Sequence, residues 1–260
     1  MYRFHDKKTD FLYFLWRLVS PILDPLMVIK GVTRYPVYIR DLLVYKAKPH
    51  SESILLKNLY PQLHDVTPST PFLKHYFYQE LWCFEQVKNN KPCLHIDIGS
   101  TYQMSGYISK LTKAVFVDIR PLDVELKNLN VVVADITRLP YRDGELESIS
   151  CLHVIEHIGL GRYGDSLDPE GHVKAIRELK RILKQGGRLY VSVPIGKPCL
   201  YFNAHRVFSP EFIVSQFSDL ALTSFGVVDD RGRFTEHPAV PDWVKDQDYA
   251  CGMFCFTKGL

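Results

Sequence analysis

The chain has 260 residues, of which 46% are apolar and 23% are charged, and this composition suits one large α/β domain with an appendage. Its formal net charge of +3 argues against a dedicated nucleic-acid binder, which usually carries a strongly basic face. Residues 1–50 hold nine Lys and Arg against four Asp and Glu, so the rest of the chain has a net charge of −2. The basic excess therefore belongs to the N-terminal segment, and we expect no nucleic-acid partner.

The six cysteines are scattered, with no Cys-x-x-Cys pair, and several lie in apolar runs. This pattern favours buried free thiols in a reducing compartment. The chain start lacks the small-residue cleavage site of a signal peptide, and no run approaches the roughly 20 apolar residues that span a bilayer. We therefore expect a cytoplasmic protein.

The most hydrophobic segment near the start is FLYFLWRLV at 11–19, and we expect Pro21 and Pro25 to end any helix there. With the lysines and arginines around it, the segment 1–30 would suit peripheral contact with an anionic membrane, at its inner face. The alternative, which we favour, is a helix packed on its own domain or on the second subunit of a homodimer.

The next segment, 46–71, contains four prolines and predicts a connector or short helices. The sequence FLKHYFYQELWCFEQV at 72–87 predicts a helix. We therefore expect a basic, aromatic-rich N-terminal extension over residues 1–60 and a single α/β domain over residues 61–260.

From Cys93 onward, strand signals alternate with helix signals. The strand candidates are short apolar runs without polar alternation, which suit strands covered on both faces. The alternation predicts a mostly parallel, doubly wound sheet, and the last two strands, with no helix-length segment between them, should pair antiparallel. Strands are predicted at 94–98, 114–118, 130–134, 147–152, 188–193, 221–228 and 249–257, and helices near 105–112, 169–184 and 210–217.

The segment LKQGGRLYVSVP at 183–194 predicts a helix that stops at a glycine pair and leads directly into a buried strand. Glycine relieves the left-handed conformation that often ends a helix. Two glycines in a row, Gly186 and Gly187, allow a very short connection, so the helix and the strand should pack closely.

Acidic residues end the first three predicted strands. Asp97 lies in HIDIGS, Asp118 ends VFVD and Asp135 follows VVVA. A carboxylate after the second strand can accept hydrogen bonds from both hydroxyls of a ribose, in a nicotinamide dinucleotide as well as in other nucleosides. Each acid taken alone is also compatible with an ordinary turn at the end of a strand.

The segment HVIEH after the fourth strand contains His153, Glu156 and His157. H-x-x-E-H is the pattern of one class of zinc proteases, in which both histidines lie one turn apart on a helix. The residues before His153 predict a strand instead, so we disfavour this interpretation.

Two further segments should lie at the same carboxyl edge of the sheet, where open α/β sheets bind ligands. The loop GLGRYGD at 159–165 offers Arg162 and Tyr163 to an anionic or sugar-like acceptor. The segment FNAHRVFSP at 202–210 offers Asn203, His205 and Arg206. Glu156 is a further acceptor-binding candidate. His205 is our first choice as general base, followed by His157 and His153, because a neutral imidazole can take a hydroxyl proton.

Taken together, these motifs resemble the class I S-adenosylmethionine (SAM) methyltransferases. LKQGG resembles the turn before their fifth strand, and DITRLPYRD at 135–143 resembles the segment after their third strand. More narrowly, HIDIGS, VDIRPL, LHVIEHIGLGRYGD and FNAHRVFSP resemble, over about residues 72–235, a domain family of unknown function that is placed among these enzymes and often found in bacterial surface-polysaccharide contexts.

The resemblance implies a Rossmann-like, seven-stranded sheet of the class I methyltransferase type, with SAM as the cofactor. Asp97, Gly99 and Ser100 would hold its amino-acid end. Asp118 with Ile119 would hold the ribose, and Asp135 with Ile136 the adenine, while His153 would line the pocket floor.

Some members of this superfamily bind Mg²⁺ through E-x-x-E-H and a distant histidine. The corresponding ligands here would be Glu156, His157 and His205. His153 stands in place of the first glutamate of that pattern, so we favour a pocket without metal.

The function that we expect is therefore O-methylation of a glycan or sugar-like acceptor by SAM. One alternative is a SAM-binding subunit without catalysis. The other is an enzyme of nucleotide sugars or NAD, which would prefer an intact G-x-G-x-x-G after the first strand, and this pattern is absent here. Thr101 stands where the D-x-G-x-G pattern of the methyltransferases has its second glycine.

Overall fold

A computed structural model describes residues 16, 18–20 and 22–259. It divides the chain into two units, Met1–Phe72 and Leu73–Leu260. Most of the predicted N-terminal aromatic helix lies outside the described residues, so its membrane or subunit contact stays a prediction. Within the described part of the chain, no helix is both long enough and apolar enough to cross a membrane.

The first unit contains a 22-residue helix, α2 (Pro25–Lys46), and a short 3-10 turn, η1 (Leu56–Asn58). The described helical residues before α2 end at Val19, so no helix of the 11–19 segment continues past the two prolines, and Pro25 is instead the first residue of a new helix, α2. The carboxylate of Asp24 accepts hydrogen bonds from the backbone N–H groups of Leu26 and Met27, at 3.0 and 3.3 Å. Proline has no N–H to leave unpaired in a first turn, so this position tolerates it.

The second unit is built on an eight-stranded sheet with the order β3-β2-β1-β4-β5-β10-β8-β9. Strands β1 to β5 are parallel, and β10 lies between β5 and β8, antiparallel to both. The strands are β1 (Leu94–Ile98), β2 (Lys113–Asp118), β3 (Leu129–Val133), β4 (Leu146–Leu152), β5 (Leu183–Ile195), β8 (Leu220–Val228), β9 (Phe234–His237) and β10 (Ala250–Lys258).

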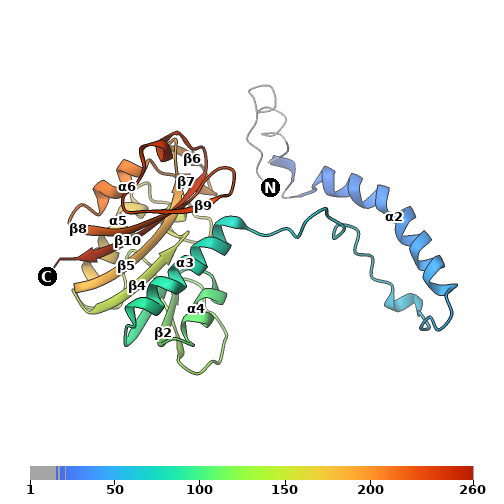
Figure 1. The fold of residues 1–260 in the computed structure, drawn as a ribbon, viewed down its shortest axis with the longest axis horizontal. Coiled ribbons are helices and arrows are strands. Elements are labelled where there is room, and N and C mark those ends of the chain that lie inside the picture. Colours follow the sequence, from blue (N-terminus) through green and yellow to red (C-terminus); the bar gives the residue numbers. More distant parts are fainter. Residues whose placement is uncertain (1–15, 17, 21, 260) are drawn as a thin grey trace. The chain divides into compact units, whose positions relative to one another are not determined.

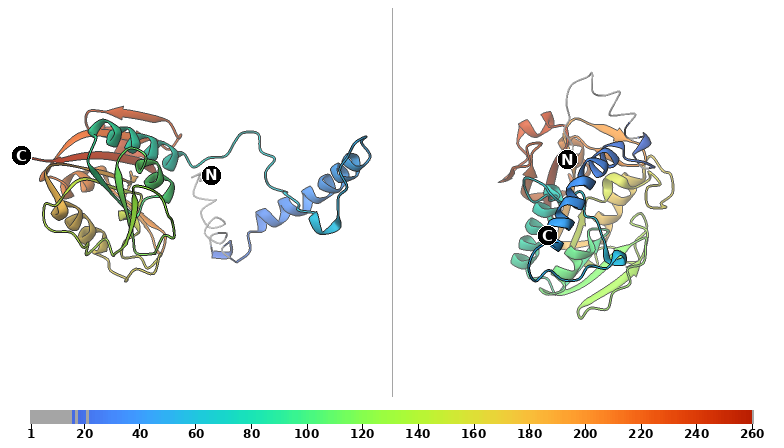
Figure 2. Two further views of the ribbon diagram at one scale, coloured as in Figure 1. Left: turned by 90° about the horizontal axis from the view of Figure 1, so that it is seen from below. Right: turned by 90° about the vertical axis from the view of Figure 1, so that its right-hand side faces the viewer.

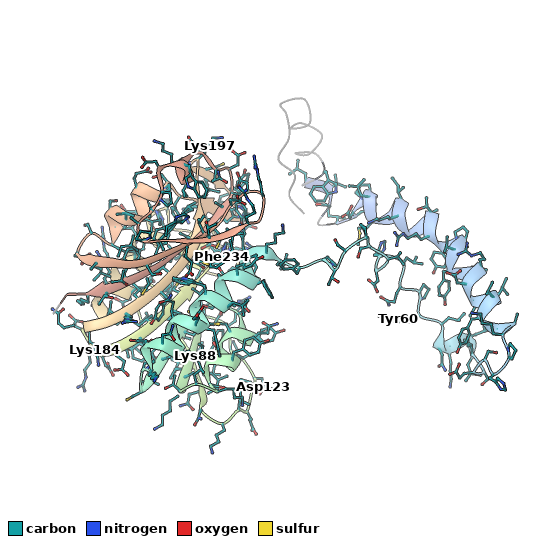
Figure 3. The ribbon with its side chains drawn as sticks, in the orientation of Figure 1. Tyr60, Lys88, Asp123, Lys184, Lys197 and Phe234 are labelled. Atoms are coloured by element: carbon teal, nitrogen blue, oxygen red, sulfur yellow. The ribbon has the colours of Figure 1, made fainter. Side chains whose placement is uncertain are left out.

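This topology confirms the predicted fold class, a doubly wound, Rossmann-like α/β sheet that is parallel except at its C-terminal strands. All seven predicted strands are present, and the last two pair antiparallel as expected. The eighth strand, β9, was not predicted; it is a four-residue edge strand whose sequence, FTEH, is too short and polar to signal a strand. Its first residue, Phe234, which is labelled in Figure 3, stacks on Tyr78 with 5.3 Å between ring centroids.

Helices cover both faces of the sheet (Figures 1 and 2). On one face, α3 (Lys74–Asn90) and α4 (Tyr102–Ile108) bury an apolar cluster that includes Trp82 and Met104. On the other face, α5 (Gly171–Ile182) and α6 (Pro210–Gln216) bury a second cluster that includes Leu179 and Ile213. Helix α4 begins earlier than the predicted 105–112, because the Thr101 hydroxyl caps it by accepting from the backbone N–H of Met104 at 3.2 Å.

The prediction that the helix stops at the glycine pair is wrong: α5 ends at Ile182, and Gly186 and Gly187 lie inside β5, where its pairing with β4 is irregular. Each glycine has its own reason. Gly186 has a φ of +70°, in the left-handed region that side chains resist. A Cβ on Gly187 would lie 2.8 Å from the carbonyl oxygen of Lys184 and 3.1 Å from that of Leu146 on β4. The pair therefore lets β5 approach its neighbouring strand where the register between them shifts.

A buried polar network joins β1 to β4 beneath α3 and α4. The Nδ1 and Nε2 atoms of His95 lie 2.8 and 2.9 Å from the hydroxyls of Ser148 and Ser150. Ser150 donates its proton to Asp97 Oδ1 at 2.7 Å, so it accepts from His95, and the proton of the neutral ring is therefore on Nε2. Burial lowers the pKa of His95 to about 3, which keeps this ring neutral.

We expect His95 to make the fold acid-sensitive. Between pH 6.5, the ordinary pKa of a histidine, and about 3, the unfolded chain binds a proton that the folded chain does not, so the free energy of unfolding falls as pH falls through this window. One such proton contributes a slope of about 1.4 kcal/mol per pH unit. Urea unfolding from pH 7 to 4 should show a shallower slope for His95→Gln. The control, a glutamine at the exposed His50, should keep the original slope. Equal slopes for all three proteins would contradict this account.

Candidate functional site

A cavity of about 500 Å³ lies at the carboxyl ends of β1, β2, β3 and β4. This is where open α/β sheets bind ligands, and the volume lies within the range of small-molecule sites. Residues from the strand ends, from the loops that follow and from helices α3 and α4 line it, among them Tyr76, Gly99, Ser100, Thr101, Gln103, Asp118, Ile119, Arg120, Asp135, Ile136, Thr137, His153, His157, Tyr163, Asp165 and Asp168.

The loop between β1 and α4 forms the floor of the cavity. Gly99 has a φ of +65°, and its N–H donates to the carbonyl oxygen of Val117 at 2.7 Å. A Cβ at Gly99 would lie 3.2 Å from both methyl groups of Val154. The Ser100 hydroxyl accepts from the backbone N–H of Leu152 at 3.1 Å, which ties the loop to β4. Gly99 and Ser100 thus both line the cavity, and their contact with a cofactor stays a prediction.

The predicted cofactor ligand Asp97 is not on the cavity wall. Side chains alternate along a strand, and this one points beneath α4, where it is fully buried. The hydroxyls of Ser100, Ser105 and Ser150 donate to its carboxylate, while burial raises its pKa. Asp97 therefore fixes the loop that carries Ser100, and its predicted contact with a cofactor has no support in this geometry.

Asp118 lies on the cavity wall at the end of β2, paired with Arg120. Its Oδ1 accepts from the Arg120 N–H at 2.7 Å and from Nε at 3.1 Å, and its Oδ2 accepts from Nη2 at 3.2 Å. A carboxylate oxygen has about two lone-pair sites, so Oδ2 can take one further donor with Arg120 in place. Ile119 lines the cavity beside it.

The third predicted acid also reaches the cavity. Asp135 accepts, through Oδ1, from the Thr137 N–H at 2.8 Å and from the Thr137 hydroxyl at 2.7 Å. Ile136 is buried in the wall next to it. The structure therefore brings the ends of β1, β2 and β3 to one cavity through Gly99, Asp118 and Asp135.

The glycine-rich loop 159–165 closes one side of the cavity. The Asp165 carboxylate accepts from the N–H groups of Gly159, Gly161 and Tyr163 at 2.8, 3.3 and 3.2 Å. The ring of Tyr163 lies on the cavity wall, with the guanidinium carbons of Arg120 and Arg162 at 4.5 and 5.0 Å from its centroid. Tyr163, a predicted acceptor residue, is therefore held between two cations.

His157 is the histidine best placed to act as a base. It lines the cavity, and its Nδ1 lies 2.6 Å from the carbonyl oxygen of Ala204, so that nitrogen carries the proton and Nε2 has a free lone pair. Burial lowers its pKa, which keeps the ring neutral near pH 7. Its Nε2 lies 3.7 Å from Oε1 of the fully buried Glu156.

The predicted base His205 lies away from the cavity wall. It begins β7 (His205–Val207), which pairs with β6 (Cys199–Tyr201), and its ring contacts Tyr201 and Tyr249 at 5.0 and 5.1 Å between centroids. Burial lowers its pKa to about 4. The sequence correctly predicted that His205 lies near the carboxyl edge of the sheet. The prediction that it acts as the base has no support from the cavity lining, which does not include it.

Three other predicted acceptor residues hold this hairpin in place. Arg206 donates to the carbonyl oxygens of Ile158 and Glu156 at 2.7 and 3.3 Å, and Asn203 donates to that of Leu160 at 3.3 Å. Arg162 donates to that of Ala204 at 3.1 Å. These polar side chains bond to backbone groups of the protein, so their predicted contact with an acceptor has no support beyond their location.

One group of side chains in the described chain brings three metal-ligating atoms within 4.8 Å of one another, and it consists of His75, His153 and Cys251. The metal candidates from the sequence do not form such a group; the rings of His157 and His205 are 6.4 Å apart. The sequence did not predict His75 and Cys251 as ligands. They lie on α3 and β10, far apart in the chain, so no short motif with the spacing of metal ligands contains them.

One family model matches part of this chain. The family model described as "Caenorhabditis protein of unknown function, DUF268" matches residues 135–222. A family of unknown function is thus matched within the range that the motifs indicate, although its description mentions no bacterial polysaccharide, so that context stays a prediction.

The uncharacterized protein MJ0638 of Methanocaldococcus jannaschii is 26% identical over 141 residues, which cover 51% of this chain and 56% of the relative. The chain thus spans little more than half the length of this curated relative. Among solved structures, YcgJ from Bacillus subtilis has a TM-score of 0.48 at 15% identity, covering 69% of this chain and 99% of its own. A second is the 1,6-didemethyltoxoflavin-N1-methyltransferase of Burkholderia thailandensis, solved with 1,6-didemethyltoxoflavin and S-adenosylhomocysteine. Its TM-score is 0.49 at 13% identity, and the match covers 71% of this chain and 78% of that one.

Proposed function

We propose that this chain is a SAM-dependent methyltransferase that methylates a hydroxyl of a glycan or sugar-like acceptor. The observation that carries the proposal is the single cavity whose wall combines Gly99, Asp118 and Asp135, at the ends of three adjacent parallel strands. A nucleoside needs acceptors for its ribose hydroxyls and for an adenine amino group, and the two carboxylates offer both.

The residues present fit SAM better than NAD. Asp118 has an acceptor site left for a ribose hydroxyl, and Asp135 lies on the neighbouring strand end for the adenine. A dinucleotide fold would need further glycines after Gly99 so that the backbone could approach a pyrophosphate. Here Thr101 uses its side chain to cap α4 and to donate to Glu80 at 2.7 Å, which leaves no open glycine turn.

SAM, when bound, supplies an electrophilic methyl group on a sulfonium. Transfer to a hydroxyl breaks a carbon–sulfur bond and forms a carbon–oxygen bond, and the hydroxyl proton must leave as the new bond forms. We propose that His157 takes this proton on Nε2, because its Nδ1–H is fixed by Ala204. Positioning of the acceptor by the wall, including Tyr163, supplies most of the remaining rate enhancement.

We expect the protein to bind SAM or S-adenosylhomocysteine in the micromolar range, about −8 kcal/mol, in calorimetric titration. Asp118→Ala should weaken this binding by about 1.5–3 kcal/mol, because it removes a charged acceptor from the cavity wall. Asp123→Ala is the matched control: this acid is exposed on the loop that follows β2 and is not part of the wall, so affinity should be unchanged (Figure 3).

Two outcomes would contradict the proposal. Strong binding of NAD without binding of SAM would replace it with the dinucleotide alternative. Binding of SAM with no transfer of radiolabelled methyl groups to any member of a panel of mono- and oligosaccharides would refute glycan methylation and favour the SAM-binding subunit without catalysis.

A further inference from the structure

We propose that His75, His153 and Cys251 form a binding site for a zinc ion beside the cavity. The three side chains come from distant parts of the sequence: the second residue of α3, the residue after β4 and the second residue of β10. Folding brings their ligand atoms within 4.8 Å of one another. Cys251 is fully buried and His153 nearly so, which separates this group from the chance clusters of exposed side chains.

The separation of the ligand atoms suits zinc. His153 Nε2 and Cys251 Sγ are 3.3 Å apart. Nitrogen at about 2.0 Å and sulfur at about 2.3 Å from a tetrahedral ion lie roughly 3.3–3.7 Å from each other. The remaining distances, at most 4.8 Å, need to shorten by up to about 1.5 Å, which requires rotation of the half-buried His75 side chain. Two imidazoles and a thiolate are ligands that favour zinc over Mg²⁺ or Ca²⁺.

The surroundings of His153 are those of a metal-bound histidine. Its Nδ1 lies 2.8 Å from Oε1 of Glu156, a fully buried carboxylate, while its Nε2 faces Cys251 Sγ. Histidines that bind metal usually have a carboxylate beside their other ring nitrogen. His153 also has a φ of +55°, a conformation that costs energy in a residue other than glycine and is concentrated at functional sites.

A buried amide next to the sulfur supports a thiolate there. Gln79 on α3 lies with Oε1 3.9 Å from Cys251 Sγ, and its Nε2 has no hydrogen-bond partner among the described residues. A thiolate accepts hydrogen bonds from an amide far better than a thiol does, and zinc binding deprotonates a cysteine. If the amide turned so that Nε2 faced Sγ, it would donate to a zinc-bound thiolate, and the Ser192 hydroxyl, which now donates to Oε1 at 2.5 Å, would accept from the same nitrogen.

Three protein ligands leave a fourth position on the ion. His153 is itself part of the cavity wall, together with Tyr76, whose ring centroid is 5.4 Å from that of His153. An open fourth position is typical of catalytic zinc sites, in contrast to structural sites with four protein ligands. The site thus borders the cavity in which we place the acceptor, but its existence does not depend on methyl transfer.

The same short distance between His153 and Cys251 would also arise from a simple thiol–imidazole hydrogen bond. His75 distinguishes the two arrangements. A hydrogen bond between His153 and Cys251 needs no third partner, and the ring of His75 lies 5.6 Å from that of His153, stacked on Tyr249 at 5.2 Å. Removal of His75 should therefore abolish a metal site and leave a hydrogen bond intact.

The test is metal analysis of the full chain, expressed with added zinc and then dialysed. The wild type should retain about one zinc ion per chain, and replacement by Co²⁺ should give a thiolate-to-cobalt charge-transfer band. His75→Ala and Cys251→Ser should each lose the band and bind zinc at least tenfold more weakly. Cys255→Ser is the matched control, because Cys255 is buried on the same strand with its sulfur near Thr223, and it should keep both the ion and the band.

A wild-type protein that binds neither zinc nor cobalt would overturn the proposal. So would a His75→Ala variant with unchanged zinc content and an unchanged cobalt spectrum, since this leaves only the hydrogen bond. If Cys251→Ser does not fold, the half-buried His75→Ala and the wild-type cobalt spectrum still decide the question. Binding of SAM is measured separately, so failure here leaves the proposed function standing.

Discussion

Replacing His157 by alanine should lower methyl transfer by roughly 10²–10⁴-fold, the usual contribution of a general base. The reason is geometric: among the histidines expected to act as a base, His157 combines a place on the cavity wall with a tautomer that leaves Nε2 unprotonated. The affinity for SAM should change little, because the carboxylates of Asp118 and Asp135 are untouched. The measurement is transfer of radiolabelled methyl groups from SAM to the most active member of the sugar panel.

The control for this experiment is His205→Ala. His205 lies outside the cavity lining and packs between two tyrosines, so its loss should reduce turnover by less than tenfold. Equal turnover for His157→Ala and the wild type, or a larger loss for His205→Ala than for His157→Ala, would show that the base has been assigned to the wrong residue.

Gly159→Ala should destabilise the second unit by at least about 2–4 kcal/mol. Gly159 has a φ of +82°, and a Cβ there would lie 1.9 Å from the carbonyl oxygen of Asp168, a backbone atom that cannot rotate away. Gly171 packs against the same point, since its own Cβ would lie 3.1 Å from the Gly159 Cα. The loop that carries Tyr163 must therefore shift as a whole, and SAM affinity should fall with stability.

Gly164→Ala separates the two causes of this effect. Gly164 lies in the same loop with a φ of +88°, but nothing lies within 4 Å of its Cβ position. Gly164→Ala should therefore lower the free energy of unfolding by roughly 1–2 kcal/mol, the cost of holding a residue with a Cβ in the left-handed conformation. Urea unfolding of both variants measures the difference. If Gly164→Ala were as destabilising as Gly159→Ala, conformational strain rather than close packing would explain the loop glycines.

The sequence allowed prediction of the parts of the site that depend on strand order. Asp118 and Asp135 end neighbouring parallel strands, and parallel strands of a doubly wound sheet present their carboxyl ends to one crevice. Apolar runs locate such strands well, because each must be covered on both faces. The cavity position of both acids and of Gly99 follows from these facts alone.

The direction of individual side chains could not be predicted in the same way. Asp97 and His205 lie at the expected edge, yet one points beneath α4 and the other into a cluster of aromatic rings. Arg206 reaches from the hairpin to backbone carbonyls of the segment after β4, which only the folded chain brings beside it. Such outcomes depend on pleat, loop conformation and long-range packing, none of which leaves a periodic pattern in the sequence.

The grouping of His75, His153 and Cys251 shows the same limit over a longer range. A cysteine in an apolar strand and a histidine in an aromatic helix each suggest ordinary core positions. Their proximity follows from the insertion of β10 between β5 and β8, which places the start of β10 near the segment after β4 and beneath α3. No spacing rule for metal ligands within a single motif describes such a set.

The bonding of Asp165 has a consequence for how tightly any molecule can be held in the cavity. Three amides of the loop 159–165 already donate to this carboxylate, and Arg162 and Asn203 join the loop to the neighbouring hairpin. Ordering a free backbone costs roughly 1–2 kcal/mol per residue. Here that entropy is lost when the chain folds, so an arriving molecule meets a preorganised wall and retains more of its contact energy as affinity.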